Sequence, residues 1–183
     1  MMLVDFFLAG LLLGLLFGGK LARLSQIPLM FFWLVVAGFS VRFFALGFSE
    51  HLVPLFQTVG MALVFVGTLF GLRLFGMPFV ALGAFCNFLV VAVNGGRMPA
   101  SKEMAVRLGL FAIADRLQRG VYPEYVLMGE TTRLHFLGDL LPYFSLVFRR
   151  PFVVSAGDYL LGIGVFLILF HYLRKGEGNG EKN

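Results

Sequence analysis

Two carboxylates, Asp139 and Asp158, lie nineteen positions apart at the start of the last of five long apolar segments. Ionisable groups at membrane depth are costly to bury, and they are therefore functional candidates. Two carboxyl groups held a few ångströms apart share a proton, so that one acts as a base toward water and the other as an acid toward a carbonyl group. These residues raise the hypothesis of an aspartyl hydrolase in which both acids are catalytic.

Each acid also has an ordinary structural explanation. Ser155 lies three residues before Asp158 at the start of the apolar segment, which is the arrangement of a capping box, and an acid in the first turn interacts favourably with the helix dipole. Asp139 alone would be an exposed loop acid. The functional hypothesis therefore depends on whether the two carboxyl groups meet.

Further polar residues are candidates for binding a substrate beside the acids: Asn87, Asn94, Arg97, His135 and Ser155. Asn87 lies within an apolar segment, where an interhelical hydrogen bond is the alternative. Asn94 precedes two glycines, which is typical of a helix C-terminus, and His135 would otherwise lie at the surface.

Arg42 lies inside another apolar segment. Its long stem lets the guanidinium reach lipid headgroups. The alternative is that Arg42 serves as the counter-ion of a lipid phosphate or a carboxylate.

The sequence predicts neither a metal site nor a cofactor. His51, His135 and His171 lie in separate segments, without the spacing of metal ligands. Cys86 is the only cysteine, which excludes an intramolecular disulfide. No glycine-rich loop followed by a lysine is present to bind nucleotide phosphates, and a net charge of +5 does not indicate nucleic-acid binding.

The composition is that of an integral membrane protein. Of the 183 residues, 59% are hydrophobic and 14% are charged, whereas about a quarter are charged in soluble domains. The mean hydropathy is +0.89. A transmembrane helix needs roughly 20 mainly apolar residues, so we expect one all-α domain, a bundle of five transmembrane helices at residues 3–19, 28–48, 54–74, 77–94 and 157–174.

Residues 95–155 form a long insert between the last two segments. The insert holds eight of the fifteen basic residues and five of the ten acids. Four apolar residues recur at helical spacing and predict an interfacial helix that ends at Gly120: Val106, Leu110, Ile113 and Leu117. We expect a helical or re-entrant piece at 131–148 and a disordered tail at 176–183.

The first segment carries Gly10, Gly14 and Gly18 at a four-residue spacing. Such small residues let two membrane helices approach closely. This glycine ridge of Gly10, Gly14 and Gly18 therefore predicts close packing against another helix of the bundle. The alternative is packing against a second copy of the chain, in a homo-oligomer. The basic residues of the short loops favour an N-terminus outside, a C-terminus inside and an insert on the outer face.

Three short stretches resemble a family of small bacterial integral membrane proteins, the domain of unknown function 5317: Asn94-Gly95-Gly96-Arg97-Met98-Pro99, Leu134-His135-Phe136-Leu137-Gly138-Asp139 and Ser155-Ala156-Gly157-Asp158. This resemblance implies an architecture and no activity. It places the protein in the bacterial cytoplasmic (inner) membrane as a multi-pass protein.

The segment from Pro151 to Gly164 locally resembles the last catalytic motif of the lipoprotein signal peptidases, which are membrane aspartyl peptidases. In that family an Asn-x-Ala-Asp element starts the final helix and a glycine follows six residues later, where Gly164 stands. The other catalytic acid of the family matches Asp139 in its separation, and Gly83-Ala84-Phe85-Cys86-Asn87 resembles the Gly-Ala-x-Gly-Asn stretch. The chain departs from the pattern, because Ser155-Ala156-Gly157 replaces Asn-x-Ala and a long insertion precedes Asp139.

Three functions are compatible with these residues. The first is a membrane-embedded aspartyl peptidase or other hydrolase that acts at the interface on a lipid-anchored or transmembrane polypeptide. The second is a non-enzymatic protein that binds or transports a lipid headgroup or a small polar ligand. The third is a structural subunit of a membrane complex.

Overall fold

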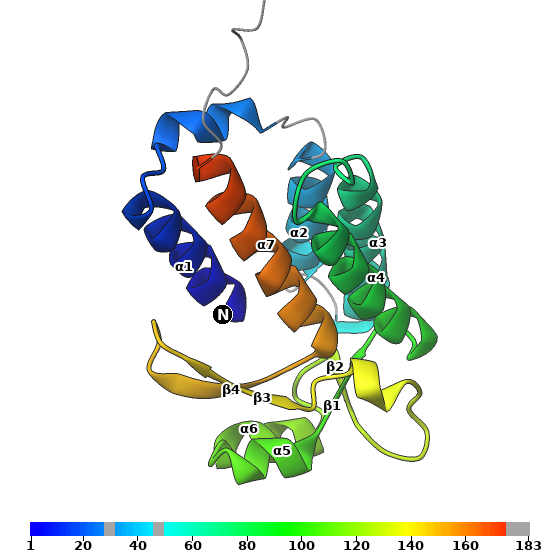
Figure 1. Cartoon of the computed structure of the whole chain (residues 1–183). Helices are drawn as coiled ribbons and strands as arrows, with labels where there is room; N and C mark the ends of the chain where they lie inside the picture. Colours follow the sequence, from blue (N-terminus) through cyan, green and yellow to red (C-terminus); the bar gives the residue numbers. More distant parts are fainter. Residues whose placement is uncertain (28–31, 46–49, 175–183) are drawn as a thin grey trace, which may run out of the picture.

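The structure, a computed structural model, describes residues 1–27, 32–45 and 50–174. Most of these residues are helical, and the longer helices lie side by side (Figure 1). Their bounds are Met2–Leu16 (α1), Phe32–Ala45 (α2), Val53–Leu69 (α3), Met77–Val93 (α4) and Ala156–Arg174 (α7). The predicted disordered tail lies outside the described residues.

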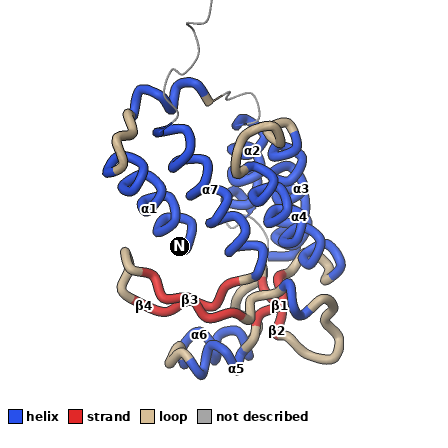
Figure 2. The backbone as a smooth tube through the Cα atoms, in the orientation of Figure 1, coloured by secondary structure: helices blue, strands red, loops and turns tan. Residues whose placement is uncertain are grey.

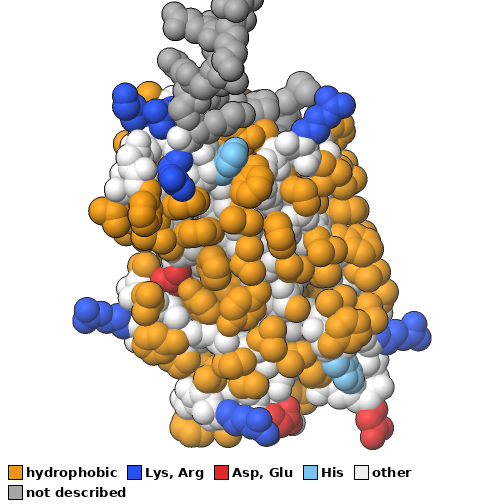
Figure 3. Space-filling view, in the orientation of Figure 1, with side chains coloured by type: hydrophobic (Ala, Val, Ile, Leu, Met, Phe, Trp, Pro, Cys, Tyr) orange, Lys and Arg blue, Asp and Glu red, His pale blue; other side chains and the backbone are white. Residues whose placement is uncertain are grey.

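Two of the helical stretches are long and apolar enough to cross a membrane, Glu50–Leu69 and Ala156–Arg174. The other three apolar helices are shorter, so helix length alone does not confirm five spans. Large apolar side chains are nevertheless exposed along the helices, among them Leu16, Trp33 and Phe43, with exposed fractions of 77%, 73% and 72%. On the face seen in Figure 3, hydrophobic side chains form a broad apolar belt, with Lys and Arg side chains above it and around its lower part.

Glycines let the helices approach closely. A Cβ atom added at Gly10 would lie 2.9 Å from the Phe166 backbone oxygen of α7, and one at Gly14 would lie 2.6 Å from Leu173. Gly18 has no neighbour within 4 Å of such an atom. Two residues of the predicted ridge therefore pack against α7 within the chain.

The insert folds as a cap beneath one end of the helices (Figure 2). Its elements are β1 (Met98–Ala100), α5 (Lys102–Arg107), α6 (Phe111–Gln118), β2 (Tyr125–Leu127), η4 (His135–Leu137), β3 (Leu141–Ser145) and β4 (Arg150–Val154). Strands β1 and β2 pair in parallel, and β3 and β4 form an antiparallel hairpin. The prediction of an all-α chain is therefore wrong in the insert.

Two details of the predicted insert also need correction. The single helix ending at Gly120 is two helices, because Gly109 adopts a φ of +73° between α5 and α6, a conformation that favours glycine. Residues 131–148 form no α-helix and contain η4 and β3. Tyr143 and Ser145 alternate with exposed Phe144 along β3, and this two-residue period is typical of a strand.

Side-chain contacts fasten the cap to the helices. The Val147 N–H donates to Asp5 of α1 at 2.9 Å, and the hydroxyl of Tyr159 in α7 donates to the Pro142 carbonyl at 2.8 Å. Gln57 of α3 donates to the Glu124 backbone oxygen at 3.2 Å. The hairpin and β2 are therefore held in place relative to three different helices.

Candidate functional site

Asp158 caps the first turn of α7 together with Ser155. The backbone N–H of Asp158 donates to the Ser155 hydroxyl oxygen at 3.0 Å, and the backbone N–H of Ser155 donates to the Asp158 carboxylate at 3.2 Å. These reciprocal bonds form the predicted capping box. They occupy one oxygen of the carboxylate, Oδ2.

Asn87 of α4 reaches across to the same cap. Its side-chain nitrogen donates to Asp158 Oδ1 at 2.9 Å, and its side-chain oxygen accepts from the Ser155 hydroxyl at 2.8 Å. Asn87 and Ser155 are buried, and each polar group in this cluster of Asn87, Ser155 and Asp158 has a partner. Thus three of the residues singled out in the sequence meet at the start of α7.

Glycines make this meeting possible. A Cβ atom at Gly157 would lie 2.1 Å from the side-chain oxygen of Asn87, and one at Gly83 would lie 2.5 Å from the Gly157 backbone oxygen. Such distances are far below van der Waals contact. Helices α4 and α7 can therefore bring Asn87 to Asp158 only because neither glycine carries a side chain.

Asp139 lies in the cap, and no hydrogen bond among the described residues joins its carboxyl group to Asp158. Its backbone N–H donates to the Pro99 carbonyl and its carbonyl accepts from the Ser101 N–H, both at 2.8 Å, so that Asp139 pairs with Ala100 on the free edge of β1. Its side chain is 8% exposed, and Oδ1 is buried without a hydrogen-bond partner in the described part of the chain. Burying a carboxyl oxygen without a hydrogen-bond partner costs free energy. The packing of the cap alone therefore gives no reason for an acid at this position.

Asp139 lines a cavity of about 240 Å³ inside the cap. The other walls are mainly apolar and come from α5, α6 and β4, among them Ala105, Leu110, Ile113, Leu117 and Phe152. Tyr122 and Tyr125 complete the lining. The cavity therefore combines one acid with an apolar surround, the usual character of a small-ligand site.

The buried carboxyl group of Asp139 is affected by its surroundings and by a neighbouring charge. Burial, and next the negative charge of Asp158, raises the pKa of Asp139 well above its ordinary value. The charge of Asp139 is the largest cause that raises the pKa of Tyr125, followed by burial and by the charges of Glu124 and Asp158, while Arg42 lowers it. Asp139 therefore favours its neutral form, and Tyr125 keeps its hydroxyl proton.

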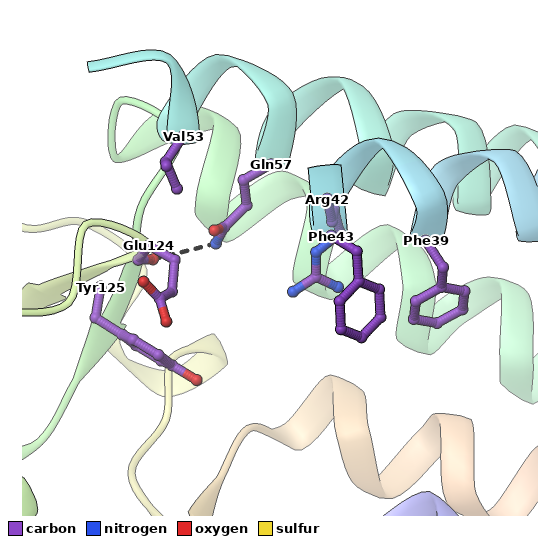
Figure 4. Close-up of a pocket in the computed structure, with 7 residues that line it drawn as sticks. All are labelled: Phe39, Arg42, Phe43, Val53, Gln57, Glu124 and Tyr125. Atoms are coloured by element: carbon purple, nitrogen blue, oxygen red, sulfur yellow. Dashed lines mark hydrogen bonds between the residues drawn. The ribbon is translucent and has the colours of Figure 1, made fainter. Parts of the chain in front are cut away.

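Tyr125 also lines a second cavity, of about 230 Å³, between β2 and helices α2 and α3 (Figure 4). Arg42, Gln57 and Glu124 supply its other polar groups. Tyr125, Gln57 and Glu124 were not singled out in the sequence, because no spacing relates them. Tyr125 lies in β2 and Glu124 immediately precedes it, so only the folding of the insert brings these two residues to the helices.

The remaining predicted site residues lie elsewhere. Asn94 holds the insert to the end of α4, since it donates to the Val90 and Arg133 carbonyls and accepts from the Arg133 N–H. Arg97 and His135 are exposed, and the His135 ring lies 2.6 Å from the Thr132 hydroxyl. In the described residues, no group of three or more His, Cys, Asp or Glu is placed to hold a metal ion.

Residues 23–170 match the family of unknown function DUF5317. The chain belongs to this family. The DUF5317 match includes Asn87, Asp139, Ser155 and Asp158. An uncharacterized protein of Thermotoga maritima is 28% identical over 166 residues, which are 91% of this chain and 89% of the relative. No solved structure matches the chain.

Proposed function

We propose that this protein is a multi-pass hydrolase of the bacterial inner membrane that cleaves a peptide bond at the membrane interface, with Asp139 and Asp158 as the catalytic pair. The observation that carries the proposal is the buried Asp139 carboxyl group. Its Oδ1 has no partner among the described residues, it lines a cavity, and its pKa is raised by burial and then by Asp158.

The apolar belt supports placement of all five apolar helices in the bilayer. The exposed side chains of α1, α2 and α4 are mostly large and apolar, as expected of surfaces that face lipid. Helices α1, α2 and α4 contain 15, 14 and 17 residues, which fall short of the roughly 20 residues of a full span. Interfacial side chains and local thinning of the bilayer accommodate such short helices.

The charges support an outer location for the cap. Lys20, Arg23, Arg73 and Arg174 lie at the helix ends remote from the cap, and no described acid accompanies them there. Basic residues in short loops mark the cytoplasmic side of a membrane protein, whereas long segments cross the membrane largely regardless of their charge. The cap, and with it the acid pair, would then face the extracytoplasmic side.

The two acids fit complementary roles. Asp158 accepts hydrogen bonds from Asn87 and from the Ser155 N–H, as suits a carboxylate. As base, Asp158 would take a proton from water while the water oxygen attacks the carbonyl carbon, and Asp139 would give its proton to the carbonyl oxygen. When the C–N bond breaks, Asp158 returns its proton to the leaving amine and Asp139 regains one from the hydroxyl group, so that one water is consumed. This division into one acid and one base is the pattern of general acid–base catalysis.

The cavity beside Asp139 supports an apolar residue next to the cleaved bond. Its walls present Leu110, Ile113 and Leu117, and the cap is fastened to the helices that would enter lipid. A polypeptide held near the membrane surface by a lipid anchor or a membrane span is therefore the preferred substrate class. The local likeness of Pro151–Gly164 to lipoprotein signal peptidases points in the same direction.

The decisive experiment compares the full chain with its Asp139→Asn variant. Both are purified in detergent, reconstituted in vesicles and incubated with a mixture of membrane-anchored peptides, and new peptide ends are identified by mass spectrometry. Loss of a general acid lowers the rate by about 10²–10⁴-fold, so the variant should give almost no product.

Asp115→Asn is the matched control, because Asp115 is an exposed acid that pairs with Arg119 on α6. It should cleave as the unmodified chain does. Equal product from the unmodified chain and Asp139→Asn, or no product from either, would refute the proposal.

A further inference from the structure

The cavity between α2, α3 and β2 contains both a cation and an anion. Its lining comprises Phe39, Arg42, Phe43, Val53, Gln57, Glu124 and Tyr125. In Figure 4, the guanidinium of Arg42 enters from α2, while the Glu124 carboxylate and the Tyr125 hydroxyl enter from the cap. Opposite charges thus face one another across a space of about 230 Å³.

The helix crossing fixes the stem of Arg42. A Cβ atom at Gly60 would lie 2.5 Å from Arg42 Cγ, and one at Gly38 would lie 2.5 Å from the Gly60 backbone oxygen. The stem of Arg42 therefore lies directly over Gly60, where any larger residue would displace it. This close approach of α2 and α3 holds the guanidinium toward the cavity.

Neither charge is neutralised by a neighbour in the described residues. The ion pair found there joins Arg119 and Asp115 on the cap, remote from this cavity. Neither the Arg42 guanidinium nor the Glu124 carboxylate makes a side-chain hydrogen bond in these residues, and Glu124 accepts from Gln57 through its backbone oxygen. Charges in partly apolar surroundings are stable when paired, and a ligand with two charges would pair both.

The polar groups match a phosphate that carries an ammonium group. A guanidinium binds phosphate oxygens through two parallel hydrogen bonds, and the protonated Tyr125 hydroxyl adds a donor. The Glu124 carboxylate suits an ammonium group at the other end. Because pockets that enclose a drug-sized molecule measure about 300–1,000 Å³, a cavity of about 230 Å³ suits a headgroup with the rest of the molecule outside.

The surface beside the cavity is suited to acyl chains. Phe39, Phe43 and Phe44 of α2 are 40%, 72% and 69% exposed. Arg42 lies in the last turn of α2, the end that meets the cap, which is headgroup level in the proposed membrane placement.

We propose that this cavity binds the phosphoethanolamine headgroup of a phospholipid, with the phosphate on Arg42, the ammonium group on Glu124 and the acyl chains along α2. The site depends on the membrane placement proposed above and not on hydrolysis. It is separate from the Asp139 cavity, although Tyr125 lines both.

Native mass spectrometry of the detergent-purified full chain tests this site. Phosphatidylethanolamine and phosphatidylglycerol are titrated separately, and soluble glycerophosphoethanolamine is added as a competitor. The full chain should bind phosphatidylethanolamine more tightly, because only this lipid offers an ammonium group to Glu124. The soluble competitor should displace it weakly, since the ester lacks acyl chains.

Substitutions test whether Arg42 binds the phosphate and Glu124 the ammonium group. Arg42→Gln removes a charged hydrogen-bond donor, so it should weaken binding of both lipids by about 10- to 100-fold. Glu124→Gln should remove the preference for phosphatidylethanolamine, and Arg73→Gln, at an exposed arginine between α3 and α4, should change neither. Arg42→Lys keeps the positive charge and should bind both lipids with intermediate affinity. It replaces Arg42→Gln in this test if that variant does not fold.

The proposal is overturned by unchanged lipid affinity in a folded Arg42 variant, by loss of binding in Arg73→Gln to the same extent, or by equal affinity for the soluble ester and the lipid. Asp139→Asn should bind lipid normally. This last measurement separates a failure of the headgroup site from a failure of the hydrolase proposal.

Discussion

Replacing Asp139 by asparagine tests whether its carboxyl group is held neutral in the folded protein. Burial and then the charge of Asp158 raise the pKa of Asp139 well above 3.8, its ordinary value. The folded chain consequently binds a proton at Asp139 at pH values where the unfolded chain has lost it. The free energy of unfolding therefore falls as the pH rises from 3.8 toward the folded pKa. Asparagine does not titrate, so the variant lacks this dependence.

The size of the effect follows from a single proton. Within that pH window, one proton changes the free energy of unfolding by about 1.4 kcal/mol for each pH unit. For a chain of 150–250 residues, 1 kcal/mol shifts the midpoint of thermal unfolding by about 2–4 °C. Between pH 4 and the folded pKa, the midpoint of Asp139→Asn should thus rise relative to that of the unmodified chain by about 3–6 °C for each pH unit.

The assay is thermal unfolding in detergent, followed by circular dichroism at several pH values. A constant difference between the two proteins would arise from the hydrogen bonds of the new amide, so the dependence of that difference on pH is the informative quantity. Asp115→Asn serves as the control, because an exposed ion pair contributes little to stability. Parallel pH profiles for the unmodified chain and Asp139→Asn would refute the neutral, buried carboxyl group and with it the acid role of Asp139.

Two further predictions concern the cluster at the start of α7. Asn87→Ala removes a hydrogen bond to the Asp158 carboxylate and one to Ser155. It should lower the free energy of unfolding, measured by chemical unfolding, by about 2–4 kcal/mol. A loss below about 0.5 kcal/mol would show that the cluster contributes little to stability. Gly157→Ala would place a methyl group against Asn87 and should lower the free energy of unfolding by at least about 1–3 kcal/mol. In the control Gly129→Ala, the new methyl group meets nothing within 4 Å, so stability should not change. Equal thermal midpoints for the two glycine variants would contradict this packing.

The sequence predicted the helices better than the cap. Long apolar runs are a strong signal, and α1, α2, α3, α4 and α7 all lie within or close to the predicted ranges. The strands are only three to five residues long, and so short a segment shows too few repeats of a two-residue period to be recognised. The parallel pairing of β1 with β2 joins residues far apart in sequence, which no local pattern reveals.

Local patterns also explain which parts of the candidate site could be predicted from the sequence. The capping box of Ser155 and Asp158 is local, and three residues of sequence suffice to propose it. The partner role of Asn87 depends on the close crossing of α4 and α7 at Gly83 and Gly157. Asn94 holds the Arg133 backbone, a long-range contact that no local pattern reveals, and its role toward a substrate stays a prediction. Whether the acid pair performs catalysis stays a prediction.

The placement of Asp139 on the edge of β1 limits how the cap can move. Hydrogen bonds run from β2 through β1 to Asp139, and the next residue, Leu140, donates to Val154 of the hairpin. Backbone hydrogen bonds thus connect all four strands of the cap through Asp139 and Leu140. Moving one strand away would break the hydrogen bonds to its neighbours. The backbone of Asp139 is therefore held between β1 and the hairpin, so that its carboxyl group keeps a defined place in the wall of the cavity.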